Sequence, residues 1–440
     1  MKSNKKFTQL ILAIFSITIM VQYAHAAEAP PIGQTTIPSG QTSIPSGQSE
    51  GITADILGQR GGVFHPFIIL EEVYTDNLFA TNSSTKSSFV TTIAPGIWIA
   101  SPGTRQRLLS IDTTTTSPGG LHLSRFKSEA DRRYQSYFLY SPEYVMYSNN
   151  SKHWHWNHKA ESLFQLNLNS GLSFDLITLL HDKKEIAGNG VTDTLYRYQD
   201  SLIDFIATYD PPSNRFELQF AYSNYALDYK EIVVSYRDRR DNSFGLSASY
   251  QFWPKTALFA EYNYSDINYV SGSITDNIER RYYAGAKWDI TAKTSGTLKL
   301  GYIEKDFDSI TLSDQSGFSA ELQTQHHLTS KRTLQVLGYR KFQESDLLGA
   351  SSFLSTGIDI GLSQKFTEKW SGTFNAFYEM NDYNEVNRDD TVYGFGPAIR
   401  FEPREWMFFD FGYYYSRNDS NVTFFDYDIN QIFLRATLSL

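Results

Sequence analysis

One short stretch of the chain gathers side chains that could bind a metal ion. It reads His153-Trp154-His155-Trp156-Asn157-His158. Imidazole is a common ligand of Zn²⁺, which proteins usually hold with three or four groups. On a β-strand, His153 and His155 would share one face, but the stretch contains no carboxylate to complete the ligand set. We therefore expect no metal site here and no cofactor.

The sequence offers little else for enzyme chemistry. Covalent catalysis needs a nucleophile, a base and an orienting group within reach of one another. The chain has no cysteine, which excludes a catalytic thiol, a thiolate metal site and a disulfide framework. It also lacks the His-Glu-x-x-His motif of zinc-dependent hydrolases. We therefore expect a protein that is not an enzyme.

A second set of reactive side chains is charged and recurs at alternate positions within apolar and aromatic segments. If these segments are β-strands, alternate side chains project from one face of a sheet. The set contains both signs of charge: Glu217, Glu261, Lys287, Asp289, Lys299, Asp359, Lys365, Glu379, Asp410 and Arg435. Charges on the inner face of a barrel decide which solutes pass, so we predict that these residues line a pore. The alternative is that they pair across strands, and the mixed signs do not indicate a simple anion or cation filter.

The segments that must position these residues show a period of two. In residues 434–440 every even position is Leu or Ala, and every odd position is Arg, Thr or Ser. A strand with this pattern has one apolar and one polar face. Because the chain ends there and the pattern recurs upstream, we interpret this stretch as the closing strand of a barrel. The expected strands cover residues 63–74, 88–100, 134–147, 153–168, 171–181, 196–209, 214–227, 241–252, 256–269, 279–290, 295–306, 317–327, 332–343, 352–366, 370–383, 389–401, 405–417 and 426–440.

The connections between these segments alternate in length. Every second connection is very short, as at Asn169-Ser170, Trp253-Pro254-Lys255 and Thr329-Ser330-Lys331. The intervening connections are mostly longer and acidic or rich in Asn and Gly, as in 182–195 and 307–316. Short turns on one side and longer loops on the other are typical of bacterial outer-membrane barrels. The sequence therefore predicts an all-β fold, a single transmembrane antiparallel β-barrel of about 18 strands (roughly 16–20 would fit), with both termini in the periplasm.

The composition agrees with a barrel in the outer membrane. Aromatic residues reach 15%, whereas hydrophobic residues make up only 41% of the 440 residues. This combination suits a thin apolar band around a polar interior. It does not suit a helical membrane protein, because no run after the N-terminal segment approaches about 18 apolar residues. Trp154 and Trp156 fall at the loop end of an expected strand, where we predict an aromatic girdle against outer-membrane lipid.

Two N-terminal segments precede the expected barrel, which covers residues 61–440. Residues 1–26 have the lysines, apolar run and Ala24-His25-Ala26 cleavage site of a secretory signal peptide. Residues 27–60 repeat the pattern Gly-Gln-Thr-x-Ile-Pro-Ser and predict a disordered periplasmic arm. Removing the three lysines of the signal changes the formal charge from −9 to −12, which argues against nucleic acid as a partner.

Residues 101–133 interrupt the regular spacing of strands. They contain Arg107-Leu108-Leu109-Ser110-Ile111-Asp112, followed by four threonines. This stretch could be a further strand, but one added strand would place the two termini on opposite sides of the membrane. We therefore expect a periplasmic insertion.

Two motifs in the first expected strands carry a family resemblance. They are Tyr74-Thr75-Asp76-Asn77-Leu78-Phe79 and Ala94-Pro95-Gly96-Ile97. With the terminal strand and the spacing between, they resemble the beta-barrel porin 2 group over residues 63–440. The chain departs from the usual outer-membrane pattern by ending on Leu440 rather than Phe. The resemblance implies a conduit for export of an exopolysaccharide, paired with a periplasmic polysaccharide-export protein.

On these grounds we expect an outer-membrane channel for secretion of an exopolysaccharide. The expected lumen also carries Phe259, Tyr283, Phe408 and Tyr414, which would either offer sliding contacts to sugar rings or narrow the pore. A general or solute-specific diffusion porin is the alternative. An outer-membrane lipid-modifying enzyme and a structural barrel without an open pore are further alternatives.

Overall fold

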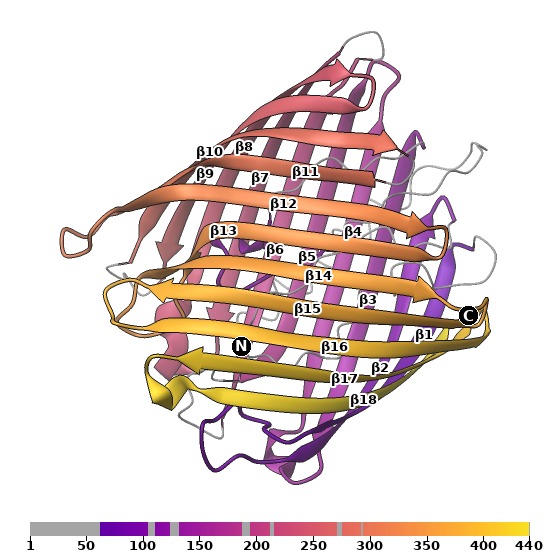
Figure 1. The fold of residues 1–440 in the computed structure, drawn as a ribbon, viewed down its shortest axis with the longest axis vertical. Coiled ribbons are helices and arrows are strands. Elements are labelled where there is room, and N and C mark those ends of the chain that lie inside the picture. Colours follow the sequence, from indigo (N-terminus) through magenta and orange to yellow (C-terminus); the bar gives the residue numbers. More distant parts are fainter. Residues whose placement is uncertain are drawn as a thin grey trace, which may run out of the picture.

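The computed structural model describes residues 62–103, 111–123, 132–186, 194–211, 215–270, 275–291 and 294–439. Within these ranges, eighteen antiparallel strands form one closed sheet (Figure 1). Each strand pairs with its neighbours in the sequence, and β1 (Phe64–Thr75) pairs with β18 (Tyr427–Ser439) to complete the ring. The prediction of a single antiparallel barrel of about eighteen strands is confirmed.

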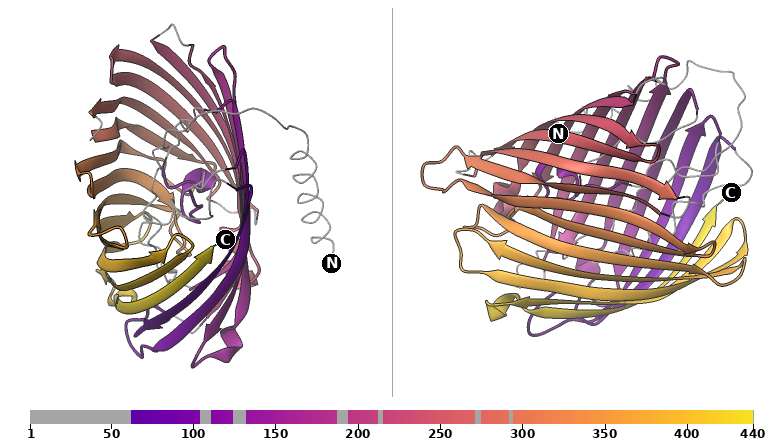
Figure 2. Two further views of the ribbon diagram at one scale, coloured as in Figure 1. Left: turned by 90° about the vertical axis from the view of Figure 1, so that its right-hand side faces the viewer. Right: turned by 45° about the horizontal axis from the view of Figure 1, so that its top comes forward.

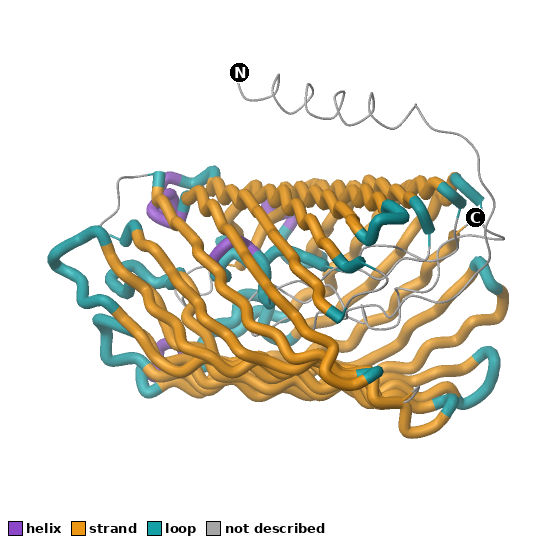
Figure 3. The backbone as a smooth tube through the Cα atoms, turned by 90° about the horizontal axis from the view of Figure 1, so that it is seen from above, coloured by secondary structure: helices purple, strands orange, loops and turns teal. Residues whose placement is uncertain are grey.

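The ring of strands is flattened, so the barrel is much longer in one direction across its cross-section than in the other (Figures 2 and 3). Because β1 begins beside the end of β18, both ends of the barrel chain lie on the side of the short turns. The remaining strands are β2 (Ser88–Ser101), β3 (Tyr134–Tyr147), β4 (His155–Asn167), β5 (Leu172–Ile186), β6 (Leu195–Tyr209), β7 (Phe216–Tyr229), β8 (Arg239–Trp253), β9 (Thr256–Tyr269), β10 (Asn277–Thr291), β11 (Thr294–Phe307), β12 (Gln315–Thr329), β13 (Arg332–Glu344), β14 (Ser352–Lys365), β15 (Trp370–Tyr383), β16 (Asp389–Arg404) and β17 (Met407–Ser420).

Alternation along each strand separates an apolar outer face from a mixed inner face. On the outer face of β8, Phe244 and Leu246 are 45% and 57% exposed. On the inner face of the same strand, Asp241 is fully buried. In hydrocarbon an unpaired backbone group costs several kcal/mol, so only a closed sheet can cross a bilayer as strands. Among the described residues, no helix has the length and apolar character needed to span a membrane.

One predicted loop is shorter than expected. We assigned residues 182–195 to a connection, but β5 continues to Ile186 and β6 begins at Leu195. The added residues pair in register, from Asp182 opposite Gln199 to Ile186 opposite Leu195. Backbone hydrogen bonds to the neighbouring strand therefore extend the sheet beyond the point where side-chain alternation ends.

The residues that follow β1 add side-chain bonds to the seam between β1 and β18. The Asp76 carboxylate accepts hydrogen bonds from the backbone N and the Nδ2 atom of Asn430, at 2.8 and 2.7 Å. The next residue, Asn77, donates from Nδ2 to the carbonyl oxygen of Asp428 at 3.1 Å. The Asp-Asn pair of the first family motif therefore ties the first strand to the last.

Replacing Asp76 with alanine is expected to lower the free energy of unfolding by about 1–2 kcal/mol, because two hydrogen bonds to a charged acceptor are lost at the closing seam. Urea unfolding of the barrel in lipid vesicles measures this. The variant Asp76→Asn keeps one acceptor oxygen and should lose less. Equal stability of the three proteins would contradict a role of Asp76 in closing the barrel.

The connection between β2 and β3 does not lie outside the barrel. Its described part, residues 111–123, is inside the lumen, where the short helix η1 (Pro118–Gly120) stands within the ring of strands (Figure 2). Our expectation of a periplasmic insertion is therefore wrong for these residues. Their polar groups pair with polar side chains of the inner wall, and this interaction holds the segment in the lumen.

The inner wall is also less polar than expected. A cluster of buried apolar residues projects inward from β2 to β7: Trp98, Ala100, Tyr137, Leu139, Leu163, Ile177, Leu179, Leu202, Tyr225 and Leu227. Ile111 of the β2–β3 connection belongs to the same cluster. The connection covers apolar surface that a water-filled lumen would otherwise expose, and this burial is favourable.

The predicted signal peptide (1–26) and periplasmic arm (27–60) lie outside the described residues, so these two assignments stay predictions.

Candidate functional site in the barrel lumen

Residues 111–123 form a small hairpin, called the lumen hairpin below. Its arms meet in an antiparallel bridge between Thr113 and Leu121, and Thr114 N donates to Gly120 O at 2.8 Å. The tip turns through Gly119 and Gly120, whose φ angles of +70° and +76° favour glycine. A Cβ atom on Gly120 would lie 2.2 Å from the Tyr225 ring on β7, so glycine also permits close packing against the wall.

The first arm of the lumen hairpin is fixed to β4, β5 and β6. The Thr113 hydroxyl donates to the Asp200 carboxylate and lies 3.1 Å from Nδ1 of His181. Asp112 forms ion pairs with Lys159 at 3.6 Å and Lys183 at 3.7 Å. Burial acts to raise the pKa of Asp112, but Lys159, Lys183 and His181 together hold it well below its usual value. Asp112 is therefore charged throughout the neutral range.

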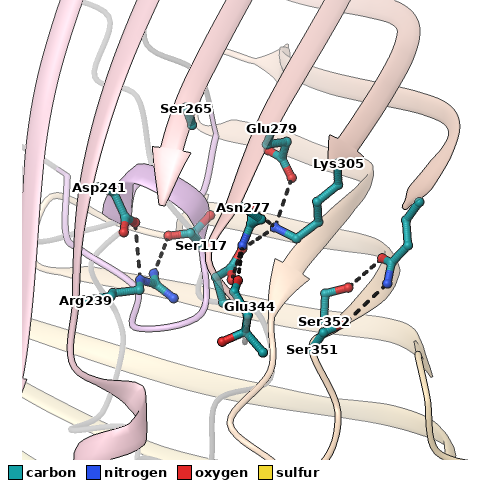
Figure 4. Close-up of polar contacts among 12 residues, drawn as sticks. Ser117, Arg239, Asp241, Ser265, Asn277, Glu279, Lys305, Glu344, Ser351 and Ser352 are labelled. Carbon is teal, nitrogen blue, oxygen red and sulfur yellow. Dashed lines mark hydrogen bonds and ion pairs between the residues drawn. The ribbon is translucent and has the colours of Figure 1, made fainter. Parts of the chain in front are cut away.

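The tip of the hairpin is fixed to β8 (Figure 4). Gly119 N donates to Oδ2 of Asp241 at 2.9 Å, and Arg239 donates to the carbonyl oxygen of Ser117 at 2.8 Å. Arg239 and Asp241 also form an ion pair at 3.2 Å, with side chains that are almost fully buried. A buried pair of this kind supplies both a donor and an acceptor to the backbone of the tip.

The second arm reaches β13, on another side of the lumen. Lys341 Nζ donates to Oγ of Ser117 at 3.1 Å and to the carbonyl oxygen of His122, and it lies 3.2 Å from Nδ1 of His122. Burial and the nearby Lys341 lower the pKa of His122 well below its usual value, so the neutral imidazole accepts from the lysine. The backbone N of Glu344 donates to Thr116 O at 2.7 Å.

A buried network supports the β13 anchor. Lys305 forms an ion pair with Glu344 and donates to Oδ1 of Asn277 at 2.8 Å (Figure 4). Tyr269 donates to the same carboxylate at 2.7 Å. The network therefore joins β9, β10, β11 and β13 at the loop end of the barrel. It fixes the residue whose backbone N holds the hairpin.

The hairpin therefore crosses the lumen and is bonded to walls that are far apart in strand order. The strand order runs from β6 through β7, β8, β9 and the next strands to β13. A cavity of about 90 Å³ is left beside the hairpin, lined in part by Pro118, Gly119, Ser223, Glu261 and Arg281. A solute passing through this part of the barrel must pass the hairpin.

Several of the predicted pore residues form ion pairs. Glu261 pairs with Lys299 at 2.9 Å. Asp410 pairs with Arg400 at 2.6 Å, and Arg435 pairs with Glu71 at 2.6 Å. This is the cross-strand pairing that the sequence left as the alternative for these residues.

The other predicted pore residues differ from one another in how deeply their side chains are buried. Asp359 and Glu379 are buried and form no ion pair with a cation among the described residues. Glu217 and Lys287 are half-buried, and Lys365 is exposed at the end of β14. The side chain of Asp289 lies outside the described part of the chain.

The histidine-rich stretch does not form a recognisable metal centre. His153 and His155 are buried, and both rings lie near Tyr147. In the described ranges, no group of three or more potential ligands lies close enough to hold a metal ion. Trp154 and Trp156 are 45% and 50% exposed at the loop end of β4.

The sequence reasoning missed the lumen hairpin as a functional element. A signal was present, because Ser117-Pro118-Gly119-Gly120 is a turn sequence inside the one long connection on the side of the short turns. A tight turn flanked by Thr and Ser could have indicated a folded hairpin. Its position in the lumen depends on wall residues from distant strands.

The closed sheet, its apolar outer face and its lumen define a channel-type barrel of the bacterial outer membrane. A sequence profile described as "Putative beta-barrel porin 2" matches residues 182–440, which is more than half of the chain. The chain belongs to this family and is an outer-membrane porin channel. The predicted family and location are confirmed.

Solved structures with a similar fold include porins of Pseudomonas aeruginosa. The outer membrane protein OpdK is 9% identical, with 86% of this chain and 99% of that chain covered and a TM-score of 0.45. OccK11 (OpdR) is 9% identical, covers 88% of this chain and 99% of its own, and gives a TM-score of 0.44. OccK5 (OpdH) is 10% identical, with 86% and 98% covered and a TM-score of 0.44. No curated protein sequence matches the chain.

Proposed function

We propose that this porin is a selective diffusion channel for small hydrophilic solutes. The observation that carries the proposal is the lumen hairpin, which is bonded to β5 and β6 by one arm, to β8 at its tip and to β13 through His122 of the other arm. A fixed segment across a lumen limits the size of what can pass and presents its own polar groups to it. This is the diffusion porin that the sequence left as the alternative.

Export of an exopolysaccharide, our first expectation from the sequence, is the second candidate. A hydrated polymer needs a wide continuous path, so the hairpin would have to leave the lumen. Each hydrogen bond to a charged group that breaks in the process costs about 1.5–3 kcal/mol. The resemblance to exopolysaccharide-associated barrels supports this candidate, with the polymer and a periplasmic polysaccharide-export protein as partners.

The proposed orientation places both termini and the short turns in the periplasm. The loop end of the barrel then faces the outside, and Trp154 and Trp156 mark the outer lipid boundary. The inner-wall positions predicted to line the pore keep that role in this proposal. The protein does no bond chemistry in either candidate function.

Reconstitution of the mature protein tests the choice between the two candidates. We expect steady single-channel currents in planar bilayers, and liposomes that swell in monosaccharide solution but not in dextran, because the fixed hairpin excludes the polymer. A deletion strain should keep its surface polysaccharide. Silent bilayers would overturn the diffusion proposal, and so would passage of dextran together with loss of surface polysaccharide from the deletion strain.

A further inference from the structure

One buried carboxylate in the lumen has no ion pair with any cation in the described part of the chain. Asp359 lies at the middle of β14, and its side chain is 1% exposed. Its Oδ2 atom has no hydrogen-bond partner, and no ion pair with a described Lys, Arg or His reaches it. A buried charge without a partner costs several kcal/mol, so Asp359 requires a proton or a bound cation.

A second carboxylate lies next to Asp359 on the neighbouring strand. In the β14–β15 register, Asp359 is opposite Phe377, and Glu379 is two residues further along the same face. Such diagonal neighbours are about 7–8 Å apart, which long side chains span. Glu379 is the charged group that acts on Asp359. Two carboxylates therefore share one part of the lumen wall.

Glu379 is held in place and keeps acceptor capacity. Its Oε2 atom accepts from the hydroxyl of Tyr339, and its Oε1 atom accepts from Nδ2 of Asn381 at 2.7 Å. The Ser355 hydroxyl also lies at this carboxylate. A carboxylate offers about four acceptor positions, so one is left for another donor. The Tyr339 ring also packs edge-on against His122 of the lumen hairpin, with centroids 4.7 Å apart. The two carboxylates therefore lie beside the hairpin, where solute must pass.

The nearby lysine is already engaged by the hairpin. An ammonium group has three donors, and Lys341 directs its contacts at Ser117 Oγ, His122 O and His122 Nδ1. Across the described residues, buried carboxylates outnumber buried lysine and arginine side chains. The charge of Lys341 acts on Glu379, but among the described residues no cation forms an ion pair with either carboxylate.

Aromatic rings adjoin the carboxylates. The Phe377 ring lies over Gly394 of β16, where an added Cβ would come within 2.7 Å of the ring. Phe377 also stacks with Tyr414 of β17, with centroids 6.4 Å apart and planes 13° apart. Faces of aromatic rings attract ammonium and guanidinium groups.

We propose that Asp359 and Glu379, with the rings of Phe377 and Tyr414, bind the ammonium or guanidinium group of a small organic cation on its way through the channel. The inference rests on the proposed diffusion function and names the solute class. A divalent metal does not fit, because Ca²⁺ takes six to eight oxygen ligands and the described residues hold no group of three potential ligands. An organic cation needs only a carboxylate acceptor and a ring face.

The test uses agmatine, which carries one ammonium and one guanidinium group, and the matched variants Asp359→Asn and Glu321→Gln. Glu321 is also buried on the lumen wall, but it has a cation beside it, because it forms an ion pair with Lys299 at 3.5 Å. Agmatine should block the current of the wild type and of Glu321→Gln at similar concentrations. For Asp359→Asn the half-blocking concentration should rise about tenfold or more, because a charge-assisted contact is lost.

Titration calorimetry of agmatine into the detergent-solubilised protein separates this inference from the proposed function. Binding that Asp359→Asn abolishes, in a protein that gives no current, supports the site and overturns the channel. Current without agmatine binding or block overturns the site and leaves the channel standing. Equal binding by wild type and Asp359→Asn also overturns the site. Heat-modifiable migration in gels confirms folding of the variant, and Glu379→Gln replaces it if folding fails.

Discussion

Single-channel conductance should increase several-fold when the tip of the lumen hairpin is removed. The bridge between Thr113 and Leu121 holds the two arms side by side, so a Gly-Gly turn can replace residues 114–120 without separating them. The truncation removes the bonds to β8 and the backbone bond to Glu344. With the tip gone, the conducting cross-section widens and larger solutes pass. Planar-bilayer currents and liposome swelling with oligosaccharides of increasing size measure both effects.

A matched truncation in a loop outside the lumen controls for general damage to the barrel. Residues 308–314 join β11 to β12, and Ile310 in this loop is fully exposed. Shortening this loop should leave conductance and size exclusion unchanged. If the hairpin truncation also leaves both unchanged, the hairpin does not restrict the pore, and the main support for selective diffusion is lost.

Breaking the Arg400–Asp410 pair should give the largest loss of stability among single substitutions in the wall. The two residues lie directly opposite each other on β16 and β17. Arg400 donates to both carboxylate oxygens, at 2.6 and 2.9 Å, and both side chains are 3% exposed. The substitution Arg400→Met leaves a buried carboxylate without its cation, which costs about 3–5 kcal/mol. Urea unfolding in lipid vesicles measures the loss.

The double variant Arg400→Met/Asp410→Asn shows whether the unpaired charge causes the loss of stability. It removes both charges, so no buried ion is left unpaired, and most of the lost stability should return. If the double variant is as unstable as the single variant, lost packing of the arginine side chain explains the effect. In that case the ion pair itself does not stabilise the wall.

The sequence by itself determined the class of fold and the order of the strands. The alternation of apolar and polar side chains along a strand is local and repeats every two residues. It can therefore be recognised from neighbouring residues, as in 434–440. The contrast between short turns and longer loops then indicated an antiparallel ring. Because each strand pairs with its neighbours in the chain, the topology required no long-range information.

Only the tertiary structure decided what occupies the lumen and which charges are paired. The bonds from Lys341 to His122 join residues 219 positions apart, and no local pattern indicates such a contact. Alternation places Asp359 and Asp410 on the same inner face, but it cannot show that Arg400 neutralises one of them and that the other has no ion-pair partner among the described residues. The position of a side chain on a face follows from the backbone period. Its partner follows from the register of distant strands and from the hairpin between them.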